Sequence, residues 1–503
     1  MRVLGSEAAR ALDARTIAAG TPGLVLMRRA ANAVVREIAS AVARRPSRGA
    51  RVIVLAGPGN NGGDGFETAR LLQAARVASN VETLLFGAPE HLSADARKTY
   101  KRLEQAGGAI REVTKEGDLE PLRVATVVVD ALFGTGLKRP ISPDGLPARA
   151  VRLVAEGKAF VVSIDLPSGL SADDAVPWTP AVRADLTVTF GYPKPCHVRL
   201  PAASLCGRIA VAGIGFLPPL EDESGSAGDV VAAGDVARLF PRREAAAHKG
   251  SFGRLLVVGG SPGMAGAPAL AARGGHRSGA GTVTVFAPEL VRAVVHALSP
   301  ETMTAGEDAD FARFDALAVG PGLGASAAAR ALLERAAGSR LPAVFDADAL
   351  NLAGDAMFFA RRAAPTVLTP HPGEAARLLG VAAARVNEDR EAAAREIASR
   401  AKAVVILKGF RSLVADPSGR VVPVLAGNPA MASGGTGDVL TGVVGACLAR
   451  GLDAFDAACA AAWLHGTAGD FVRETRGEES LTASDVVEAL PEAFYAAREG
   501  AGG

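Results

Sequence analysis

Short runs rich in valine and isoleucine alternate along this chain with alanine-rich stretches of helical length, and glycines or prolines stand where the runs end. Such alternation is typical of βαβ units, in which helices connect the strands of a parallel sheet. An α/β fold is therefore predicted for the chain. In the first half we expect a helix at 24–43 and strands at 51–56, 81–86, 125–130, 159–165 and 185–190.

The alternation is interrupted by FLPPLEDESGSAGD at 216–229, where prolines, acidic residues and small polar residues gather. It restarts with six further runs, GRLLVVGG, GTVTVFAP, DALAVGPG, LPAVFDAD, PTVLTPHPGE and AVVILKG. Domains of about 150 residues would give three units in a chain of 503 residues. Because α/β domains often exceed about 200 residues, two large domains are the first expectation. We predict a first domain at 1–216, a linker at 217–229 and a second domain at 230–503.

Charge and hydrophobicity exclude two classes of partner. Lysine and arginine number 55 against 53 acidic residues, so no strong field attracts nucleic acid or an acidic membrane. No uncharged apolar run approaches the roughly 20 residues of a membrane span. Glu7 and Asp13 interrupt the stretch that a signal peptide would need, and the four cysteines lack the spacing of a disulfide scaffold. We therefore expect a cytoplasmic protein that acts on small molecules.

The run GPGNNGGDG at 57–65 directly follows the first predicted strand and precedes a helical stretch. Such a turn exposes backbone N–H groups to an anion at the positive end of a helix. The glycine pattern alone is weak evidence, because an ordinary dinucleotide fold would also end its second strand in an acid, and here Phe86 stands there. Asn60, Asn61 and Asp64 add more polar groups than a turn requires. The run therefore predicts a phosphate cradle.

Two later strands each end in a carboxylate followed by a glycine loop, at Asp130 and at Asp165. Ligands of open parallel sheets bind beyond the carboxyl ends of the strands. Both carboxylates are therefore expected to border one crevice with Asn61, joined by Ser168. An oxygen-rich pocket of this kind suits a hard cation or acid/base catalysis. The alternative is that each aspartate only caps the helix that follows.

The runs LDARTIAAGTPGLVLMRRAA, GPGNNGGDG, VVVDALFGTGLKRP and SIDLPSGL resemble the NAD(P)H-hydrate epimerase family over roughly residues 1–215. The resemblance implies a Rossmann-like three-layer domain that interconverts the R and S forms of NADH or NADPH hydrated at C6 of the nicotinamide ring. It also implies a potassium ion in the site.

By position, the resemblance makes Asn61, Asp130 and Ser168 the potassium ligands. It makes Asp165 the carboxylate that contacts the substrate, and we expect Asp165 to assist proton movement at the epimerising centre. The residues that match the substrate loops are Asn60, Asn61, Gly62, Gly63, Asp64, Gly134, Thr135, Gly136, Leu137, Lys138, Arg139 and Pro140.

The second half contains GNPAMASGGTGDVLTGVVGACLARG at 427–451, a glycine-rich turn followed by an apolar helix. Its consecutive N–H groups can converge on an anion at the helix start. Asp438 stands there and could act as a base towards a hydroxyl during phosphoryl transfer. The alternative is that Asp438 is only a helix N-cap. His371 lies between two prolines at another strand end. Lys408 could bind a nucleotide phosphate, and the alternative is that it is an exposed lysine without a ligand.

The set HKGSFG, GSPGMAGAPALAA, VGPGLG, FDADALN, TPHPGE, LKG and GNPAMASGGTGDVLTG resembles the ribokinase-like superfamily, and within it NAD(P)H-hydrate dehydratase, over roughly residues 230–495. The resemblance implies a ribokinase-like α/β domain that dehydrates the S hydrate. It also implies that ADP, the usual nucleotide of bacterial members, or ATP drives the dehydration, and that Mg²⁺ assists the nucleotide reaction. The hydroxyl is phosphorylated, and phosphate then leaves as the ring double bond re-forms.

By position, Gly322, His371 and Asp438 match the residues that bind the hydrate, and Ala267 is expected beside them. Asp438 is the expected catalytic base. The residues that match the nucleotide loops are Lys408, Gly409, Phe410, Arg411, Ser412, Asn428, Pro429, Ala430, Met431, Ala432, Ser433, Gly434, Gly435, Thr436 and Gly437.

A two-step repair enzyme is the interpretation that uses both halves, because the epimerase would supply a dehydratase that accepts one epimer. One alternative is a ribokinase-type kinase for a small molecule such as hydroxymethylpyrimidine, with the first domain as a regulator. Another is that the first domain is a non-catalytic module that binds proteins or nucleotide ends. We also expect the chain to form a homo-oligomer.

Overall fold

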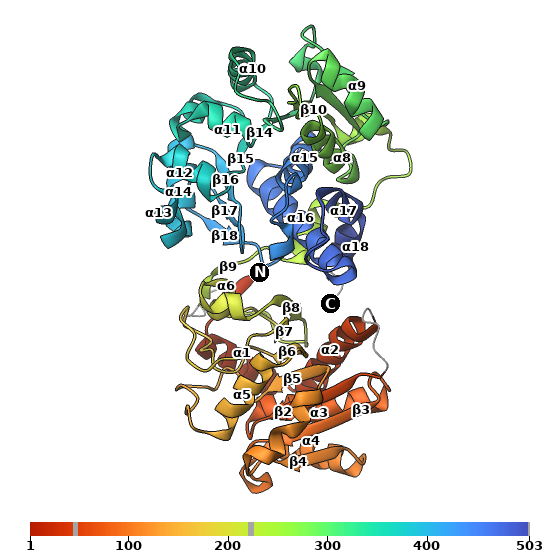
Figure 1. Cartoon of the computed structure of the whole chain (residues 1–503), viewed down its shortest axis with the longest axis vertical. Coiled ribbons are helices and arrows are strands. Elements are labelled where there is room, and N and C mark those ends of the chain that lie inside the picture. The colour runs from red at the N-terminus through yellow and green to blue at the C-terminus, as the bar shows by residue number, and fades with distance from the viewer. Residues whose placement is uncertain (44–48, 220–225, 501–503) are drawn as a thin grey trace. The chain divides into compact units, whose positions relative to one another are not determined.

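The computed structural model describes residues 1–43, 49–219 and 226–500. The chain divides into two compact units, Met1–Asp229 and Val230–Gly503. Each unit has a largely parallel sheet between layers of helices, so the predicted α/β fold is confirmed (Figure 1). Within the described ranges, no helix is both long and apolar enough to cross a membrane.

The first unit contains a seven-stranded sheet in the order β4-β3-β2-β5-β6-β7-β8, and all neighbouring strands run parallel. The strands are β2 (Arg51–Ala56), β3 (Asn80–Leu85), β4 (Ala109–Glu112), β5 (Val127–Ala131), β6 (Phe160–Ile164), β7 (Leu186–Phe190) and β8 (Arg208–Ala212). Its helices are α1 (Ser6–Ala18), α2 (Gly23–Ala43), α3 (Asn60–Ala74), α4 (Ala94–Gln105), α5 (Leu146–Glu156) and α6 (Pro195–Val198), with 3-10 turns at Pro89–His91, Glu116–Val124 and Ala202–Leu205.

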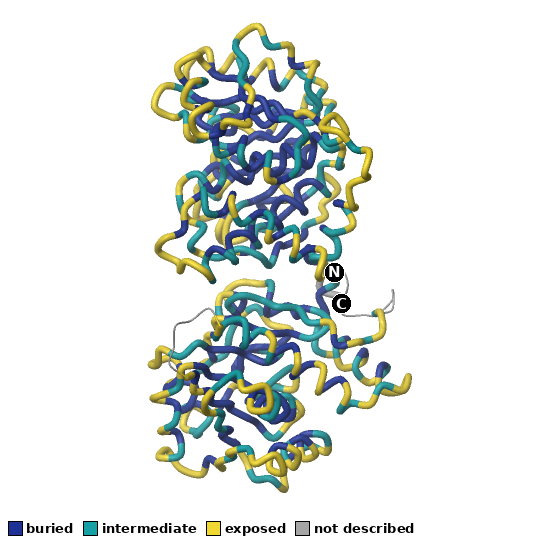
Figure 2. The backbone as a smooth tube through the Cα atoms, turned by 90° about the vertical axis from the view of Figure 1, so that its right-hand side faces the viewer, coloured by how far each residue is buried: buried dark blue, intermediate teal, exposed yellow. Residues whose placement is uncertain are grey.

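Both faces of this sheet are apolar because alternate side chains of each strand point to opposite faces. In β2, Val52 and Val54 pack with α2, α3 and α4, whereas Ile53 and Leu55 pack with α5 on the other face. Figure 2 shows the resulting pattern, with buried segments inside the unit and exposed segments on its outside. Strands covered on both faces read as continuous apolar runs, which is why the sequence located them.

The range 217–229, predicted as a linker, contains strand β9 (Ser226–Asp229). It pairs antiparallel with β1 (Arg2–Leu4) in a small separate sheet of the first unit. Residues 220–225 of the predicted linker lie outside the described residues. The sequence did not predict β9, because this strand is short and consists of small and acidic residues without an apolar run.

The second unit contains a nine-stranded sheet in the order β12-β11-β10-β13-β14-β15-β16-β17-β18, in which only β17 and β18 are antiparallel to their neighbours. The strands are β10 (Arg254–Val258), β11 (Thr282–Phe286), β12 (Met303–Ala305), β13 (Ala316–Val319), β14 (Ala343–Phe345), β15 (Thr366–Leu368), β16 (Val404–Leu407), β17 (Leu413–Ala415) and β18 (Val421–Pro423). All six runs predicted in this half contain strands.

Helices cover both faces of this second sheet. One core contains residues of α7 (Ala233–Leu239), α8 (Gly266–Arg277), α9 (Glu289–Leu298), α15 (Thr436–Ala449), α16 (Ala454–Arg476), α17 (Ala483–Glu488) and α18 (Leu490–Gly500). The other contains residues of α10 (Ala327–Ala337), α11 (Asp348–Ala353), α12 (Pro372–Leu379), α13 (Ala383–Glu388) and α14 (Arg390–Ala401). Short 3-10 turns lie at Lys249–Phe252, Phe311–Arg313, Ala356–Arg361 and Pro429–Met431.

Each sheet has one point where the direction of its strand order reverses. In the first unit the chain builds β2, β3 and β4 outward and then returns to place β5 beside β2. In the second unit it builds β10, β11 and β12 and then places β13 beside β10. Loops at the carboxyl ends of the strands diverge at such a point, and ligands of open α/β sheets bind there.

Candidate functional site

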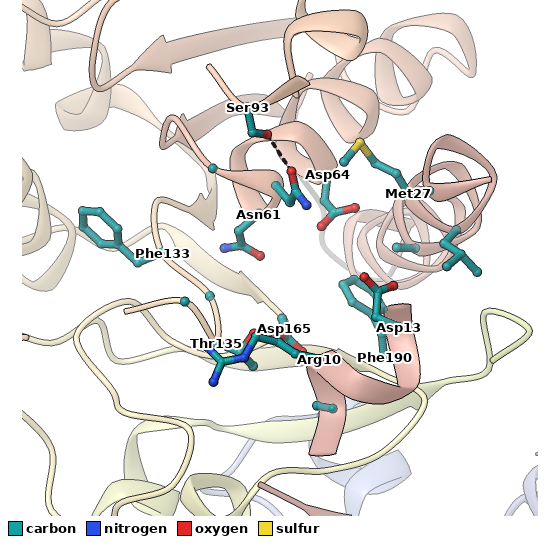
Figure 3. Close-up of a pocket in the computed structure, with 18 of the residues that line it drawn as sticks. Arg10, Asp13, Met27, Asn61, Asp64, Ser93, Phe133, Thr135, Asp165 and Phe190 are labelled. Atoms are coloured by element: carbon teal, nitrogen blue, oxygen red, sulfur yellow. Dashed lines mark hydrogen bonds between the residues drawn. The ribbon is translucent and has the colours of Figure 1, made fainter. Parts of the chain in front are cut away.

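A cavity of about 850 Å³ lies at the switch point of the first unit. Its walls include α1, α2, the loop from β2 into α3, the loop after β5 and the ends of β6 and β7 (Figure 3). Most of the predicted substrate residues line this cavity, namely Asn60, Asn61, Asp64, Gly134, Thr135, Gly136, Leu137, Lys138, Arg139 and Asp165. Gly62, Gly63 and Pro140 belong to the same loops but do not line it.

Glycine is required in the loop after β2 because backbones nearly touch there. A Cβ on Gly62 would lie 1.8 Å from the carbonyl oxygen of Gly57, and a Cβ on Gly57 would lie 1.9 Å from that of Leu132. Helix α3 begins at Asn60 with Gly59 as its N-cap, so its first N–H groups lack intrahelical acceptors. The loop therefore combines close packing with free donors for an anion.

Replacing Gly62 by alanine should destabilise the protein by about 1–3 kcal/mol, because the new methyl group must displace the Gly57 carbonyl. Gly59→Ala is the matched control, since a Cβ at Gly59 has no neighbour within 4 Å and its φ is −85°. Urea unfolding of the full chain measures both effects. Equal midpoints for the two variants would show that the close packing is not needed.

Asp130, near the end of β5, is fully buried and bound to Ser168. Its carboxylate accepts hydrogen bonds from Ser168 Oγ at 2.6 Å, Ser168 N at 2.8 Å, Ser163 Oγ at 2.9 Å and Leu132 N at 3.3 Å. Burial raises the pKa of Asp130, and the bonds from Ser168 and Ser163 oppose that rise. Asp130 caps no helix, since the next helix, α5, has Gly145 as its N-cap.

Asn61 packs against the loop after β5, where a Cβ on Gly134 would lie 3.2 Å from Asn61 Oδ1. Its other amide atom, Nδ2, is buried and has no hydrogen-bond partner within the described part of the chain. The N and O atoms of an asparagine amide are assigned from their partners, so a reversed amide would place an oxygen at this buried position.

Asp165 follows β6 in the left-handed region, with φ of 67°. Its Oδ1 accepts hydrogen bonds from Lys194 Nζ at 2.5 Å and from Thr189 Oγ1 at 3.1 Å. Burial alone would raise the pKa of Asp165, but the positive charge of Lys194 and its hydrogen bond hold the pKa below its ordinary value. Asp165 is therefore an ionised carboxylate in the cavity wall.

Sequence reasoning missed Lys194, which also lines the cavity and is only 3% exposed. The available signal was its place in YPKPCH, between two prolines just after a buried strand. Its Nζ also donates to Thr189 Oγ1 at 2.8 Å, so one ammonium group binds both Asp165 and Thr189 in the cavity wall.

Asp64 reaches the same cavity from the start of α3 (Figure 3). Its carboxyl forms no hydrogen bond or ion pair with other described residues. Burial raises the pKa of Asp64 well above its ordinary value, and the negative charges of Asp165 and Asp13 raise it further.

In the second unit, Asp438 lies in the first turn of α15. The helix begins at Thr436, its N-cap is Gly435 with φ of 91°, and no side chain caps this end. The alternative that Asp438 is only an N-cap is therefore wrong. Burial raises the pKa of Asp438 to about 7, the charge of Asp346 adds to the rise, and Lys408 opposes it.

Lys408 is not an exposed lysine, because its Nζ lies 2.7 Å from Asp346 Oδ1 and 3.8 Å from Glu374 Oε2. Thr441 Oγ1 donates to the other oxygen of Asp346 at 2.7 Å. Burial alone would lower the pKa of Lys408, but Asp346 and Glu374 raise it. Sequence reasoning missed Asp346, although it directly follows the strand in FDADALN. This buried network holds Lys408 beside α15, where a Cβ on Gly437 would lie 3.3 Å from Nζ.

Of the residues predicted to bind the hydrate, Gly322 and Ala267 meet, and His371 is linked to the Lys408 network. A Cβ on Gly322, whose φ is 61°, would lie 3.2 Å from Ala267 Cβ, so these two positions meet. His371 is the N-cap of α12, and its Nδ1 accepts from Gly373 N at 2.9 Å. Its backbone N–H donates to Glu374 Oε2 at 2.8 Å, which links His371 to the Lys408 network.

The predicted nucleotide loops are held by side chains that sequence reasoning did not select. Asp470, on α16, accepts hydrogen bonds from Gly427 N at 3.0 Å and from Asn428 Nδ2 at 2.8 Å. Arg390, on α14, donates to the carbonyl oxygens of Leu407 and Lys408. The loops therefore have fixed shapes at the same edge of the sheet as Asp438.

Known proteins match both units. Residues 255–492 match the family model described as NAD(P)H-hydrate dehydratase, and residues 23–196 match the model described as YjeF-related protein N-terminus. The bifunctional NAD(P)H-hydrate repair enzyme Nnr of Moorella thermoacetica is 40% identical over 499 residues, covering 93% of this chain and 92% of its own. The Nnr of Escherichia coli is 34% identical over 450 residues, covering 87% and 84%.

A solved structure matches the second unit. The ADP/ATP-dependent NAD(P)H-hydrate dehydratase of Bacillus subtilis, co-crystallised with ATP and Mg²⁺, is 30% identical with a TM-score of 0.50. The match covers 54% of this chain and 98% of that chain. With relatives that match both units over most of their length, the chain belongs to the family of bifunctional NAD(P)H-hydrate repair enzymes.

Proposed function

We propose that this chain repairs hydrated NADH and NADPH in two steps. The first unit interconverts the R and S epimers, and the second dehydrates the S epimer at the expense of a nucleotide. The observation that carries the proposal is that each unit places a carboxylate of shifted pKa beside glycine-rich loops, Asp165 in one and Asp438 in the other. The relatives' names join the same two activities.

Dehydration needs a base where the hydroxyl on C6 of the hydrate attacks the nucleotide. With a pKa of about 7, Asp438 can accept that hydroxyl proton near neutral pH. The oxygen attacks the terminal phosphorus and the shortened nucleotide leaves. Phosphate then departs from C6 with the C6–O electron pair, and C5 loses a proton to water as the ring double bond re-forms. We expect the backbone N–H groups of Gly434, Gly435 and Gly437 to stabilise the charge on the transferred phosphoryl group.

The nucleotide is ADP or ATP, and Mg²⁺ accompanies its phosphates. Mg²⁺ in such sites uses one or two carboxylates together with phosphate oxygens and water. The negative charges of Asp346, Asp348 and Glu374 raise the pKa of Asp438, and these carboxylates would hold Mg²⁺ beside the transferred phosphate. Mg²⁺ would supply neutralisation of the phosphate charge.

A potassium ion in the first unit fits Asn61, Asp130 and Ser168. Hard cations prefer oxygen ligands, and Asp130 and Ser168 already share a buried oxygen cluster. The buried amide of Asn61, which has no partner among the described residues, can turn an oxygen towards a cation. The ion would hold the loop after β5 against α3 and supply positive charge near the cavity.

The direct test is turnover of a mixed-epimer hydrate by the full chain with ADP or ATP and Mg²⁺, followed at the absorbance of reduced nicotinamide. Both epimers should be converted, and each product should release one phosphate. Epimerisation should also slow when potassium is replaced by sodium. The small-molecule kinase alternative is not favoured by the relatives, and it would instead leave phosphate on an organic product.

The rate of S-hydrate dehydration should rise with pH until Asp438 is ionised. Because the pKa of Asp438 is raised to about 7, its protonated and inactive form dominates in acid. The pH profile of kcat/KM with pure S hydrate should therefore bend near that pKa. A flat profile across neutrality would contradict the assignment of Asp438 as the base.

Lys194→Met should impair epimerisation through Asp165. Without the ammonium charge, the pKa of Asp165 rises, so the acidic limb of the epimerisation profile should move up by about 1–3 pH units. Lys138→Met is the control, since Lys138 lines the same cavity without pairing with Asp165, and it should raise KM instead. An unmoved acidic limb in Lys194→Met would contradict this role.

Cytoplasmic location and self-association stay predictions. Cell fractionation tests the first, and sedimentation velocity of the full chain tests the second.

A further inference from the structure

The cavity of the first unit holds two carboxyl groups in opposite electrostatic settings. Asp165 is bound by Lys194 and Thr189, whereas Asp64 is bound by no described residue. Asp64 enters from α3 and Asp165 from the end of β6, and both line the same cavity (Figure 3). A carboxylate paired with a lysine can accept a proton, and an unpaired carboxyl in a cluster of negative charges can donate one.

We propose that Asp64 is the general acid of epimerisation and that Asp165 is the matching general base. The proposal rests on the proposed function of the first unit and goes beyond a substrate-binding role for Asp64. It is carried by the placement of an unpaired and a lysine-bound carboxyl in one cavity, each on a different structural element.

The proton of Asp64 passes to the C6 hydroxyl, and the C6–O bond breaks with its electron pair remaining on oxygen, which leaves as water. The lone pair of the ring nitrogen moves into the N1–C6 bond and gives an iminium ion. A second water attacks C6 from the opposite face and loses a proton to Asp165. Nothing is oxidised or reduced, and the two carboxyls regain their starting protonation by exchange with solvent or by the reverse reaction.

The electrostatic surroundings agree with these roles. Burial, Asp165 and Asp13 keep the pKa of Asp64 high, while Lys194, with a smaller effect from His197, keeps the pKa of Asp165 low. The epimerisation rate should therefore fall in acid as Asp165 gains a proton and in alkali as Asp64 loses one. The other charged residues that line the cavity are Arg10, Asp13, Asp95, Lys138 and Arg139.

Asp64→Asn should lower kcat for R-to-S interconversion by about 10²–10⁴-fold, the usual contribution of a general acid. Asp64→Glu, which keeps an acidic group, should recover part of that loss. Asp144→Asn is the matched control, because Asp144 belongs to the same unit but is exposed and is not among the residues that line the cavity. It should keep wild-type kcat. Equal kcat for Asp64→Asn and Asp144→Asn would overturn the proposal.

The wild-type chain provides a test that does not depend on any variant's folding. Incubated with one epimer in H₂¹⁸O and without nucleotide, it should incorporate one solvent oxygen at C6 for each inversion. Inversion with the original oxygen retained would overturn the proposal while leaving epimerase activity established. If the wild-type chain does not interconvert the epimers, the proposed function itself fails, so the two failures are distinguishable.

Discussion

Asp438→Asn should slow dehydration of pure S hydrate by about 10²–10⁴-fold, because an amide cannot take the hydroxyl proton during phosphoryl transfer. The side chain keeps its size, so α15 and the glycine turn before it should keep their positions. Nucleotide-dependent formation of NADH measures the loss. R/S interconversion by the same chain should stay at the wild-type rate, since Asp438 belongs to the second unit.

The opposite distribution of effects would contradict this assignment. If Asp438→Asn slowed both activities equally, the chain would have lost its fold or would use one shared site. If dehydration were unchanged, another base would have to be found near the Gly434–Gly437 turn. The network of Lys408 and Asp346 is the nearest alternative in the described structure, and Lys408→Met would then be the next variant to measure.

Asp165→Asn should produce the reciprocal result. R-to-S interconversion should fall by about 10²–10⁴-fold, because the variant lacks the ionised carboxylate that accepts a proton. It also leaves the buried ammonium group of Lys194 without the negative charge that lies 2.5 Å away in Asp165. The loss is measured by incubating one epimer without nucleotide, separating the R and S forms by chromatography at successive times, and following their ratio. Dehydration of pure S hydrate should be unchanged.

Asp438→Asn is the control for that experiment, since it changes the same group in the other unit. Loss of both activities in Asp165→Asn would contradict the division of labour between the units. Retention of interconversion would show that Asp165 only contacts the substrate, and the proton would then have to leave through another group of the cavity.

The sheets could be predicted because buried parallel strands leave long β-branched runs in the sequence. Residues 51–56 form β2 as predicted, and the run at 185–190 contains β7. Strands that lack such runs were missed. β4 lies at the edge of its sheet with mostly exposed side chains, and β9 is formed by small and acidic residues.

The candidate sites could be predicted where the backbone itself carries the feature. Gly57, Gly62, Gly63 and Gly65 are needed for close approach, and Gly435 has a φ of 91°, so these features are visible in the sequence. Lys194 and Asp346 were missed because their roles depend on partners far along the chain. Lys194 meets Asp165 across 29 positions, and Lys408 meets Asp346 across 62. No local pattern records such pairs.

The measurement that tests two independent, consecutive sites most directly is repair of a mixed-epimer hydrate by an equimolar mixture of Asp165→Asn and Asp438→Asn chains. With nucleotide and Mg²⁺, Asp165→Asn alone should convert the S fraction and then stop, and Asp438→Asn alone should make no NADH. The mixture should convert both epimers fully, because S hydrate diffuses from one chain to the other. If the mixture stops where Asp165→Asn alone stops, the two activities do not reside in separate sites that use these carboxylates.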